Sequence, residues 1–261
     1  MDFTVLASGS KANCVFISDG TDALIIDAGL SVKETLRRLR LAGGNESIVR
    51  AVLLTHEHGD HVRGASALAR RLNVPLYATQ GTLGRFGRVA GPASPPEHKK
   101  VRCGERMEIG GFVVAPFATS HDAAEPCGYI VGEGGVRLCC CTDTGQITES
   151  MRTSMHRADA LILESNHCPE MLRTGPYPEM LKRRIGSRTG HLSNKQASEY
   201  LHTCGHDLCA LVLAHLSDIN NTSAKAEAAA AEGFGLFYEP GKVHSIPGGD
   251  TTECWNCWIR L

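Results

Sequence analysis

The sequence has no uninterrupted apolar stretch that approaches the ~20 residues a membrane-spanning helix requires. It also has almost no net charge, because 27 Lys and Arg residues face 28 Asp and Glu residues, which leaves −1 at pH 7. This balance excludes a globally basic nucleic-acid binder, although a local basic groove stays open. Aromatic residues make up 5% of the chain, so we expect few stacking platforms for unpaired bases.

Disulfide bonds are not expected either. The chain has 11 Cys, an odd number, and Cys139, Cys140 and Cys141 are consecutive in an apolar run. Consecutive cysteines rarely reach the geometry of a disulfide, so we interpret these three as buried strand residues. The first residues show no basic start followed by an apolar core, so no signal peptide is visible. Together these features predict a cytoplasmic protein.

Cys254 and Cys257 have the spacing of a metal half-site or a redox pair. No second pair with this spacing exists in the chain. We therefore interpret the C-terminal segment as a packing element, with the metal role as the alternative.

The order of apolar segments predicts the fold class. Strands are followed by helices, and this succession occurs twice along the chain. The sequence shows no internal repeat of fixed period and no linker-like change in composition. We predict a single domain over residues 1–261, in the α/β (α+β) class, in which two mixed sheets pack face to face with helices outside. This is a four-layer αββα sandwich.

The expected elements are short. Strands are predicted at 3–7, 14–18, 23–27, 51–55, 76–78, 106–109, 112–117, 128–133, 136–141, 160–163, 210–214 and 236–239. Helices are predicted at 32–41, 63–72, 147–155, 177–186, 194–204 and 222–232. Residues 81–96 are rich in Gly and Pro and predict a loop with one weak helical turn. Ser31 and Glu34 form a capping-box pattern at the start of the first helix.

The densest group of chemically active side chains is the string His56-Glu57-His58-Gly59-Asp60-His61. It follows the apolar strand 51–55 directly, where a rigid element can present side chains to a cleft. Three imidazoles and a carboxylate within six residues cannot all bind one ion comfortably. They can divide between two ions, His56 and His58 on one and Asp60 and His61 on the other. A solvated His-rich turn is the simpler alternative.

Three further residues of ligand type occupy matching positions, each just past the end of an apolar strand: His121, Asp143 and His215. Each alone could be an ordinary hydrogen-bonded loop residue. Together with the string at 56–61, ligand-type residues follow four strand ends in one chain. This pattern indicates instead that distant loops converge on a pair of metal ions. A mixed set of imidazole and carboxylate ligands suits Zn or Mn, and Fe is possible.

The string His-x-His-x-Asp-His, with a distal His, a distal Asp and a last His, resembles the metallo-β-lactamase superfamily. The chain is most similar to its WalJ/YycJ-type branch, whose members are similar to 5′-exonucleases. The other matching strings are Leu6-Ala7-Ser8-Gly9-Ser10, Ser120-His121-Asp122-Ala123, Thr142-Asp143-Thr144-Gly145, Glu164-Ser165-Asn166-His167, Gly190-His191-Leu192-Ser193-Asn194 and Ala214-His215-Leu216-Ser217. The resemblance spans nearly the whole chain.

The resemblance implies a role for each ligand residue. His56, His58 and His121 would hold the first metal ion. Asp60, His61 and His215 would hold the second, and Asp143 would bridge both. Asp27 and Glu164 would contact ligand side chains rather than the metal ions.

Two divalent ions about 3.5–4 Å apart can share a hydroxide at neutral pH, and this hydroxide would attack phosphorus in a phosphodiester. We predict Asp60 and His191 as catalytic residues. His191 is a candidate proton donor or phosphate ligand because a helix begins just after it. The alternative is that His191 only caps that helix.

The distribution of charge favours a phosphate-rich substrate. Residues 61–106 contain nine Lys or Arg and two Glu, and the basic run 182–184 precedes His191. Two basic segments on either side of an acidic metal site are typical of a groove for a nucleic-acid backbone, although solvated helix faces would look the same. The predicted substrate-binding residues are Ser8, Ser10, Asn166, His167, Arg85, Arg88, Arg184 and Ser193.

These features predict a binuclear metal-dependent hydrolase that trims DNA from a 5′ end. It would bind nucleic acid, and neither a membrane nor an obligate protein partner is indicated. The alternative is a small-molecule metallo-hydrolase of a cyclic phosphodiester, a lactone or a thioester, because one fold hosts many chemistries. A metal-stabilised binding protein without activity is a third hypothesis. The complete ligand set argues against it.

Overall fold

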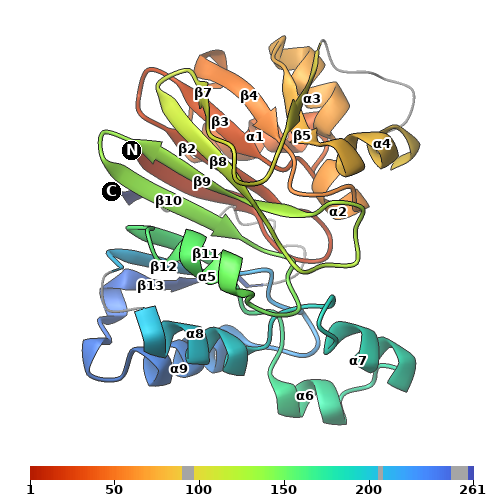
Figure 1. Cartoon of the computed structure of the whole chain (residues 1–261), viewed down its shortest axis with the longest axis vertical. Helices are drawn as coiled ribbons and strands as arrows, with labels where there is room; N and C mark the ends of the chain where they lie inside the picture. The colour runs from red at the N-terminus through yellow and green to blue at the C-terminus, as the bar shows by residue number, and fades with distance from the viewer. Residues whose placement is uncertain (90–96, 205–207, 248–257) are drawn as a thin grey trace.

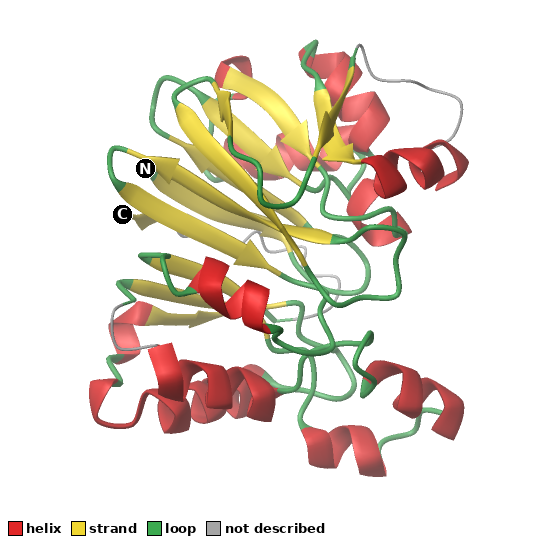
Figure 2. Ribbon diagram, viewed as in Figure 1, coloured by secondary structure: helices red, strands yellow, loops and turns green. Residues whose placement is uncertain are grey.

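The computed structural model describes residues 1–89, 97–204, 208–247 and 258–261, and these residues form two seven-stranded sheets that pack face to face. Helices cover the outer face of each sheet, so the chain has four layers (Figures 1 and 2). The predicted αββα sandwich is confirmed. The C-terminal pair Cys254 and Cys257 lies outside the described residues.

The first sheet is antiparallel on one side and parallel on the other. Its strand order is β14-β1-β2-β3-β4-β5-β6. The strands are β1 (Asp2–Ala7), β2 (Cys14–Ser18), β3 (Ala23–Ile26), β4 (Val49–Leu53), β5 (Leu76–Thr79), β6 (His98–Val101) and β14 (Ile259–Arg260). Pairing is antiparallel from β14 to β3 and parallel from β3 to β6.

The second sheet repeats this division. Its order is β13-β12-β11-β10-β9-β8-β7, antiparallel from β7 to β10 and parallel from β10 to β13. The strands are β7 (Met107–Ile109), β8 (Phe112–Ala118), β9 (Cys127–Glu133), β10 (Val136–Cys141), β11 (Ala160–Glu164), β12 (Ala210–Ala214) and β13 (Val243–Ser245). The carboxyl ends of parallel strands are where α/β proteins place their ligands, and each sheet has such ends.

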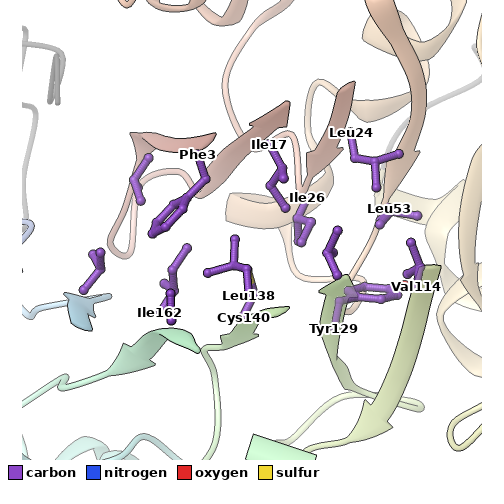
Figure 3. Close-up of a cluster of buried hydrophobic side chains, with 14 of the residues drawn as sticks. Phe3, Ile17, Leu24, Ile26, Leu53, Val114, Tyr129, Leu138, Cys140 and Ile162 are labelled. Atoms are coloured by element: carbon purple, nitrogen blue, oxygen red, sulfur yellow. The ribbon is translucent and has the colours of Figure 1, made fainter. Parts of the chain in front are cut away.

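The core between the sheets is apolar and closely packed. Figure 3 shows Phe3 and Ile17 of the first sheet facing Leu138 and Ile162 of the second, all four at most 1% exposed. Truncation of one such side chain to Ala costs about 2–5 kcal/mol. Because both sheets share this core, we propose that the chain folds as one domain.

The helices form the outer layers. They are α1 (Val32–Leu41), α2 (Gly59–Val62), α3 (Ala65–Leu72) and α4 (Gln80–Val89) beside the first sheet, and α5 (Glu149–Met155), α6 (Pro169–Thr174), α7 (Glu179–Ile185), α8 (Asn194–Cys204) and α9 (Ser223–Phe234) on the side of the second (Figure 1). Among the described residues, none of the helices is both long and apolar enough to cross a membrane. The backbone N–H of Glu34 donates to Ser31 Oγ at 3.3 Å, which confirms Ser31 as the N-cap of α1, while the Glu34 carboxylate accepts from Arg37 and Arg38.

Cys139, Cys140 and Cys141 alternate across β10. Cys140 belongs to the core between the sheets, whereas Cys139 and Cys141 face the helices, and all three are buried. Burial raises the pKa of the Cys140 thiol above its usual value. The predicted packing role is confirmed.

Two predicted elements are wrong. The first part of the expected loop at 81–96 belongs to α4, whose Thr82 and Phe86 are one turn apart and buried, and this burial outweighs the poor helix propensity of its glycines. Residues 90–96 lie outside the described residues. A Cβ atom at Gly81 would lie 2.6 Å from Glu125 Cβ, so a glycine lets α4 approach that segment. The expected strand at 236–239 is instead a 3₁₀ turn at Gly235–Phe237, whose Leu236 is exposed; the edge strand is β13.

Candidate metal centre

All seven predicted metal ligands converge on one site. Potential ligand atoms lie within 4.8 Å of one another in four groups: His56, His58 and His121; Asp60, His61 and His215; His56, His61 and Asp143; and Asp143, Glu164, His191 and His215. Asp143 Oδ2 is 3.2 Å from His61 Nε2 and Asp143 Oδ1 is 3.7 Å from His121 Nε2. Asp143 therefore faces both of the His-rich groups.

Sharp backbone turns at the strand ends aim these side chains. Asp27, Asp143 and His215 follow β3, β10 and β12 with φ angles of 59°, 56° and 56°, the left-handed region that non-glycine residues rarely adopt. Such a conformation costs of order 1–3 kcal/mol at each residue. The backbone N–H of His215 donates to Ser8 Oγ at 2.7 Å, and that of Asp27 donates to Leu53 O at 2.8 Å. These bonds hold the turns at His215 and Asp27 in place.

Three of the histidines have their Nδ1 atoms fixed by an acceptor. His61 Nδ1 is 2.7 Å from Asp27 Oδ2, His121 Nδ1 is 2.9 Å from Gly190 O and His215 Nδ1 is 2.8 Å from Glu164 Oε1. A carbonyl or carboxylate oxygen accepts, so each Nδ1 carries the proton that it donates. Nε2 is then the ring atom left to ligate a metal ion in the cluster.

Several buried atoms in the cluster make no hydrogen bond within the described residues: His56 Nε2, His215 Nε2 and Asp143 Oδ2. A buried polar atom without a partner costs about 1–3 kcal/mol. Divalent cations would satisfy these atoms, and the nitrogen and oxygen donors are those that Zn and Mn accept. The residues present therefore fit a binuclear metal site.

The local electrostatics also favour cations. Burial, followed by the charge of His61, lowers the pKa of His56 well below its usual value, and burial lowers the pKa of His58. Burial acts to raise the pKa of Asp143, but His215 and His61 bring it well below the usual range. His56 and His58 are therefore neutral beside an ionised carboxylate. Burial acts to lower the pKa of His61 and His215, but Asp143 and the neighbouring carboxylates raise both well above the usual value, so these carboxylates favour positive charge at the site.

Glu164 lies fully buried beneath the cluster. Its Oε1 accepts from His191 Nδ1 and His215 Nδ1, each at 2.8 Å, and its Oε2 accepts from two backbone N–H groups. Burial works to raise the pKa of Glu164, but His191 and His215 lower it to about 2. The structure places Glu164 and Asp27 against ligand histidines, which fits the orienting roles we predict for them.

His191 lies beside the cluster, with Nδ1 3.7 Å from Asp143 Oδ1. Gln196 N donates to Ser193 Oγ at 3.3 Å and Ser193 N donates to Gln196 Oε1 at 3.0 Å, so Ser193 forms the cap of α8. His191 precedes this cap, which removes the alternative that it only caps the helix. Gly190 permits the turn, because a Cβ atom there would lie 2.2 Å from Arg184 O.

The predicted substrate-binding residues have different surroundings. Ser8 and Asn166 both hold the backbone of His215, since Asn166 Nδ2 donates to its carbonyl at 2.8 Å. Ser10 is exposed, and the side chain of Arg88 on α4 lies outside the described residues. Arg184 Nε donates to Asp122 Oδ2 at 2.8 Å. Substrate contact by these residues stays a prediction.

The motifs did not identify Asn13 as a site residue. Its Nδ2 is 3.2 Å from Asp60 Oδ2 and 2.9 Å from His61 Nε2, and its Oδ1 accepts from the backbone N–H of Gly9 at 3.0 Å. Asn13 follows the string at Ser8–Ser10 and directly precedes β2. Its place between the predicted strands at 3–7 and 14–18 was the only available signal.

A fold of two packed sheets with a buried His and Asp cluster at their strand ends defines a metal-dependent hydrolase. The chain belongs to the metallo-β-lactamase superfamily: the family model described as "Beta-lactamase superfamily domain" matches residues 23–216.

Relatives and a solved structure agree with this assignment. The chain is 36% identical over 242 residues to "Exodeoxyribonuclease YycJ" of Bacillus anthracis, which covers 90% of this chain and 92% of the relative. It is 33% identical to "Exodeoxyribonuclease WalJ" of Streptococcus pneumoniae, covering 84% and 82%. The crystal structure of Zn²⁺-bound PqqB from Methylobacterium extorquens has the same fold, with a TM-score of 0.73 at 19% identity, covering 100% of both chains.

Proposed function

We propose that this protein is a 5′-exonuclease that hydrolyses phosphodiester bonds of DNA at a two-metal centre. The observation that carries the proposal is the position of Asp143, whose two carboxylate oxygens face two separate groups of ligand atoms. Relatives named exodeoxyribonucleases, similar over most of the chain, support DNA as the substrate.

His56, His58 and His121 would hold one cation, and Asp60, His61 and His215 would hold the other, with Asp143 between them. When bound, the two cations supply Lewis-acid activation of water and of the scissile phosphate. Asp60 Oδ2 is 3.5 Å from His61 Nε2 and 3.7 Å from His215 Nε2. From this position the Asp60 carboxylate would also accept a hydrogen bond from a water at the site.

His191 would deliver the proton that the leaving oxygen needs. Its Nδ1–H donates to the buried carboxylate of Glu164, which fixes the ring and leaves Nε2 as the atom that carries the transferable proton. The side chain is 21% exposed, so a substrate can reach it. Glu164 acts through His191 and is a positioning residue.

Exposed arginines would bind the DNA backbone. Arg85, with a side chain 64% exposed, has its Nη1 3.8 Å from Glu57 Oε1, next to the ligand string. Arg184 is paired with Asp122, whose Oδ1 is 3.4 Å from His121 Nε2. Such contacts carry little sequence information, so binding should be weakly selective and should weaken steeply with salt.

The test is incubation of the purified protein with 5′-phosphorylated duplex DNA and Mn²⁺ or Zn²⁺, followed by measurement of released nucleotides. We expect release by the parent and a loss of about 10³-fold or more in His56→Ala, because one cation loses a ligand. The matched control is His156→Ala, a histidine exposed at the end of α5.

Two results would reject the proposal. One is an absence of nucleotide release by the metal-loaded parent. The other is release by His56→Ala at the rate of the control. Hydrolysis of a small cyclic phosphodiester, lactone or thioester without release from DNA would favour the small-molecule alternative.

A further inference from the structure

A basic hollow lies next to the metal centre. Its volume is about 540 Å³, and its walls come from the segment after β11 and from α6 and α7. The residues that matter for its chemistry are His167, Arg173, Glu179, Lys182 and Arg183. In Figure 1, α6 and α7 lie at the end of the lower helical layer opposite the strand β13.

Two contacts tie the hollow to the metal centre. His167 directly follows Asn166, whose side chain donates to the carbonyl of His215 at 2.8 Å. His167 also pairs through an isolated β-bridge with Ser193, two residues after His191. The wall of the hollow therefore begins beside a residue that holds the backbone of a proposed metal ligand, and it is paired with the segment that carries the proposed proton donor.

The charge of the hollow is positive. Arg173, Lys182 and Arg183 face a single acidic residue, Glu179, which leaves a net charge of +2. Lys182 Nζ donates to Arg173 O at 2.9 Å and lies 3.3 Å from Glu179 Oε1, so this ammonium group is held in place. Arg173 and Arg183 are exposed and have no ion pair within the described residues. Both guanidinium groups are therefore available to bind an anion.

His167 provides the buried part of the wall. It is 4% exposed, and its Nδ1 makes no hydrogen bond within the described residues. Burial lowers the pKa of His167 to about 4, so the ring is neutral at pH 7 and offers one N–H donor and one acceptor. A bound water or a ligand oxygen would satisfy this ring nitrogen.

We propose that this hollow binds the 5′-terminal phosphate of the DNA strand being cleaved, an inference that rests on the proposed function. A terminal phosphomonoester carries −1.5 to −2 at pH 7, about twice the charge of an internal diester, and so matches a site of net charge +2. Two unpaired arginines suit the bidentate binding of its oxygens. The hollow would thus bind the 5′-terminal phosphate while the next phosphodiester of the strand lies at the cations.

The experiment compares two duplexes of one sequence, with either a 5′-phosphate or a 5′-hydroxyl on the strand to be degraded. The parent should show a kcat/KM about 10- to 100-fold higher on the phosphorylated strand, the size expected for charge-assisted hydrogen bonds. In the double variant Arg173→Ala, Arg183→Ala this ratio should fall to about 1. Arg40→Ala, an arginine 64% exposed on α1, is the matched control and should keep the ratio of the parent.

Equal cleavage rates of the parent on both duplexes would overturn the subsite. A double variant that cleaves both duplexes more slowly but keeps the parent's ratio of kcat/KM would overturn it too. Binding of the same strands, labelled at the 3′ end, is measured by fluorescence anisotropy. This measurement distinguishes failure of the phosphate subsite from failure of the proposed nuclease function. Without any cleavage, a preference for the phosphorylated strand that the double variant abolishes keeps the subsite and rejects the nuclease. Equal binding without cleavage rejects both.

Discussion

The two sheets contribute to the metal centre in different ways. The first sheet supplies a contiguous string after β4, in which four proposed ligands lie between His56 and His61. The second sheet supplies single residues from separate strand ends: His121 after β8, Asp143 after β10, Glu164 at the end of β11 and His215 after β12. One side of the centre is therefore local in sequence, and the other exists only after the second sheet has formed.

The two sides also differ in what their buried carboxylates do. Asp27, on the first sheet, accepts from His61 Nδ1 and from the Thr55 hydroxyl and backbone N–H. Glu164, on the second sheet, accepts from both His215 and His191. We infer that Asp27 serves metal binding alone, whereas Glu164 joins metal binding to proton transfer. The comparison can be tested by separating these two functions.

The largest effect in this comparison is expected from His191→Ala. This variant should keep both cations and lose about 10²- to 10⁴-fold in kcat, the usual contribution of a general acid. Metal content by elemental analysis and single-turnover rates on phosphorylated DNA would be measured on the same preparation. A variant that loses a cation together with its activity would make His191 a metal ligand, a role its 3.7 Å distance from Asp143 also permits.

A smaller effect is expected from the two carboxylates. Asp27→Asn and Glu164→Gln should each lower the affinity for divalent cations by about 10- to 100-fold, as removal of a group that orients a ligand does. At saturating metal, Asp27→Asn should regain the parent's kcat, but Glu164→Gln should stay slow because His191 has lost its fixed position. Competition with a chromogenic chelator gives the affinities. Full recovery of Glu164→Gln at high metal would remove the distinction between the sheets.

The difference between the sheets also explains how much of the site the sequence could predict. The string at 56–61 could be interpreted alone, because ligand spacing and the preceding strand are both local. His121, Asp143 and His215 needed the assumption that strand ends converge, and the structure brings them together. Asn13 carried no such pattern, since its contact with Asp60 depends on the packing of a distant loop.

The fold shows the same limit. Most strands and α1 follow from apolar pattern and capping, which act within a few residues. The helix α4 does not, because its stability comes from burial of Thr82 and Phe86 and not from its glycine-rich composition. The 3₁₀ turn at Gly235–Phe237 has the composition of a strand, yet it leaves Leu236 in solvent. In α4 tertiary packing decides against local preference.

The most direct test of the account is a crystal structure of the metal-soaked protein with anomalous scattering recorded at the absorption edge of the metal. The account predicts two peaks, one among His56, His58 and His121 and one among Asp60, His61 and His215, with Asp143 bonded to both. A single peak at saturating metal, or two peaks that leave Asp143 unbonded, would contradict it.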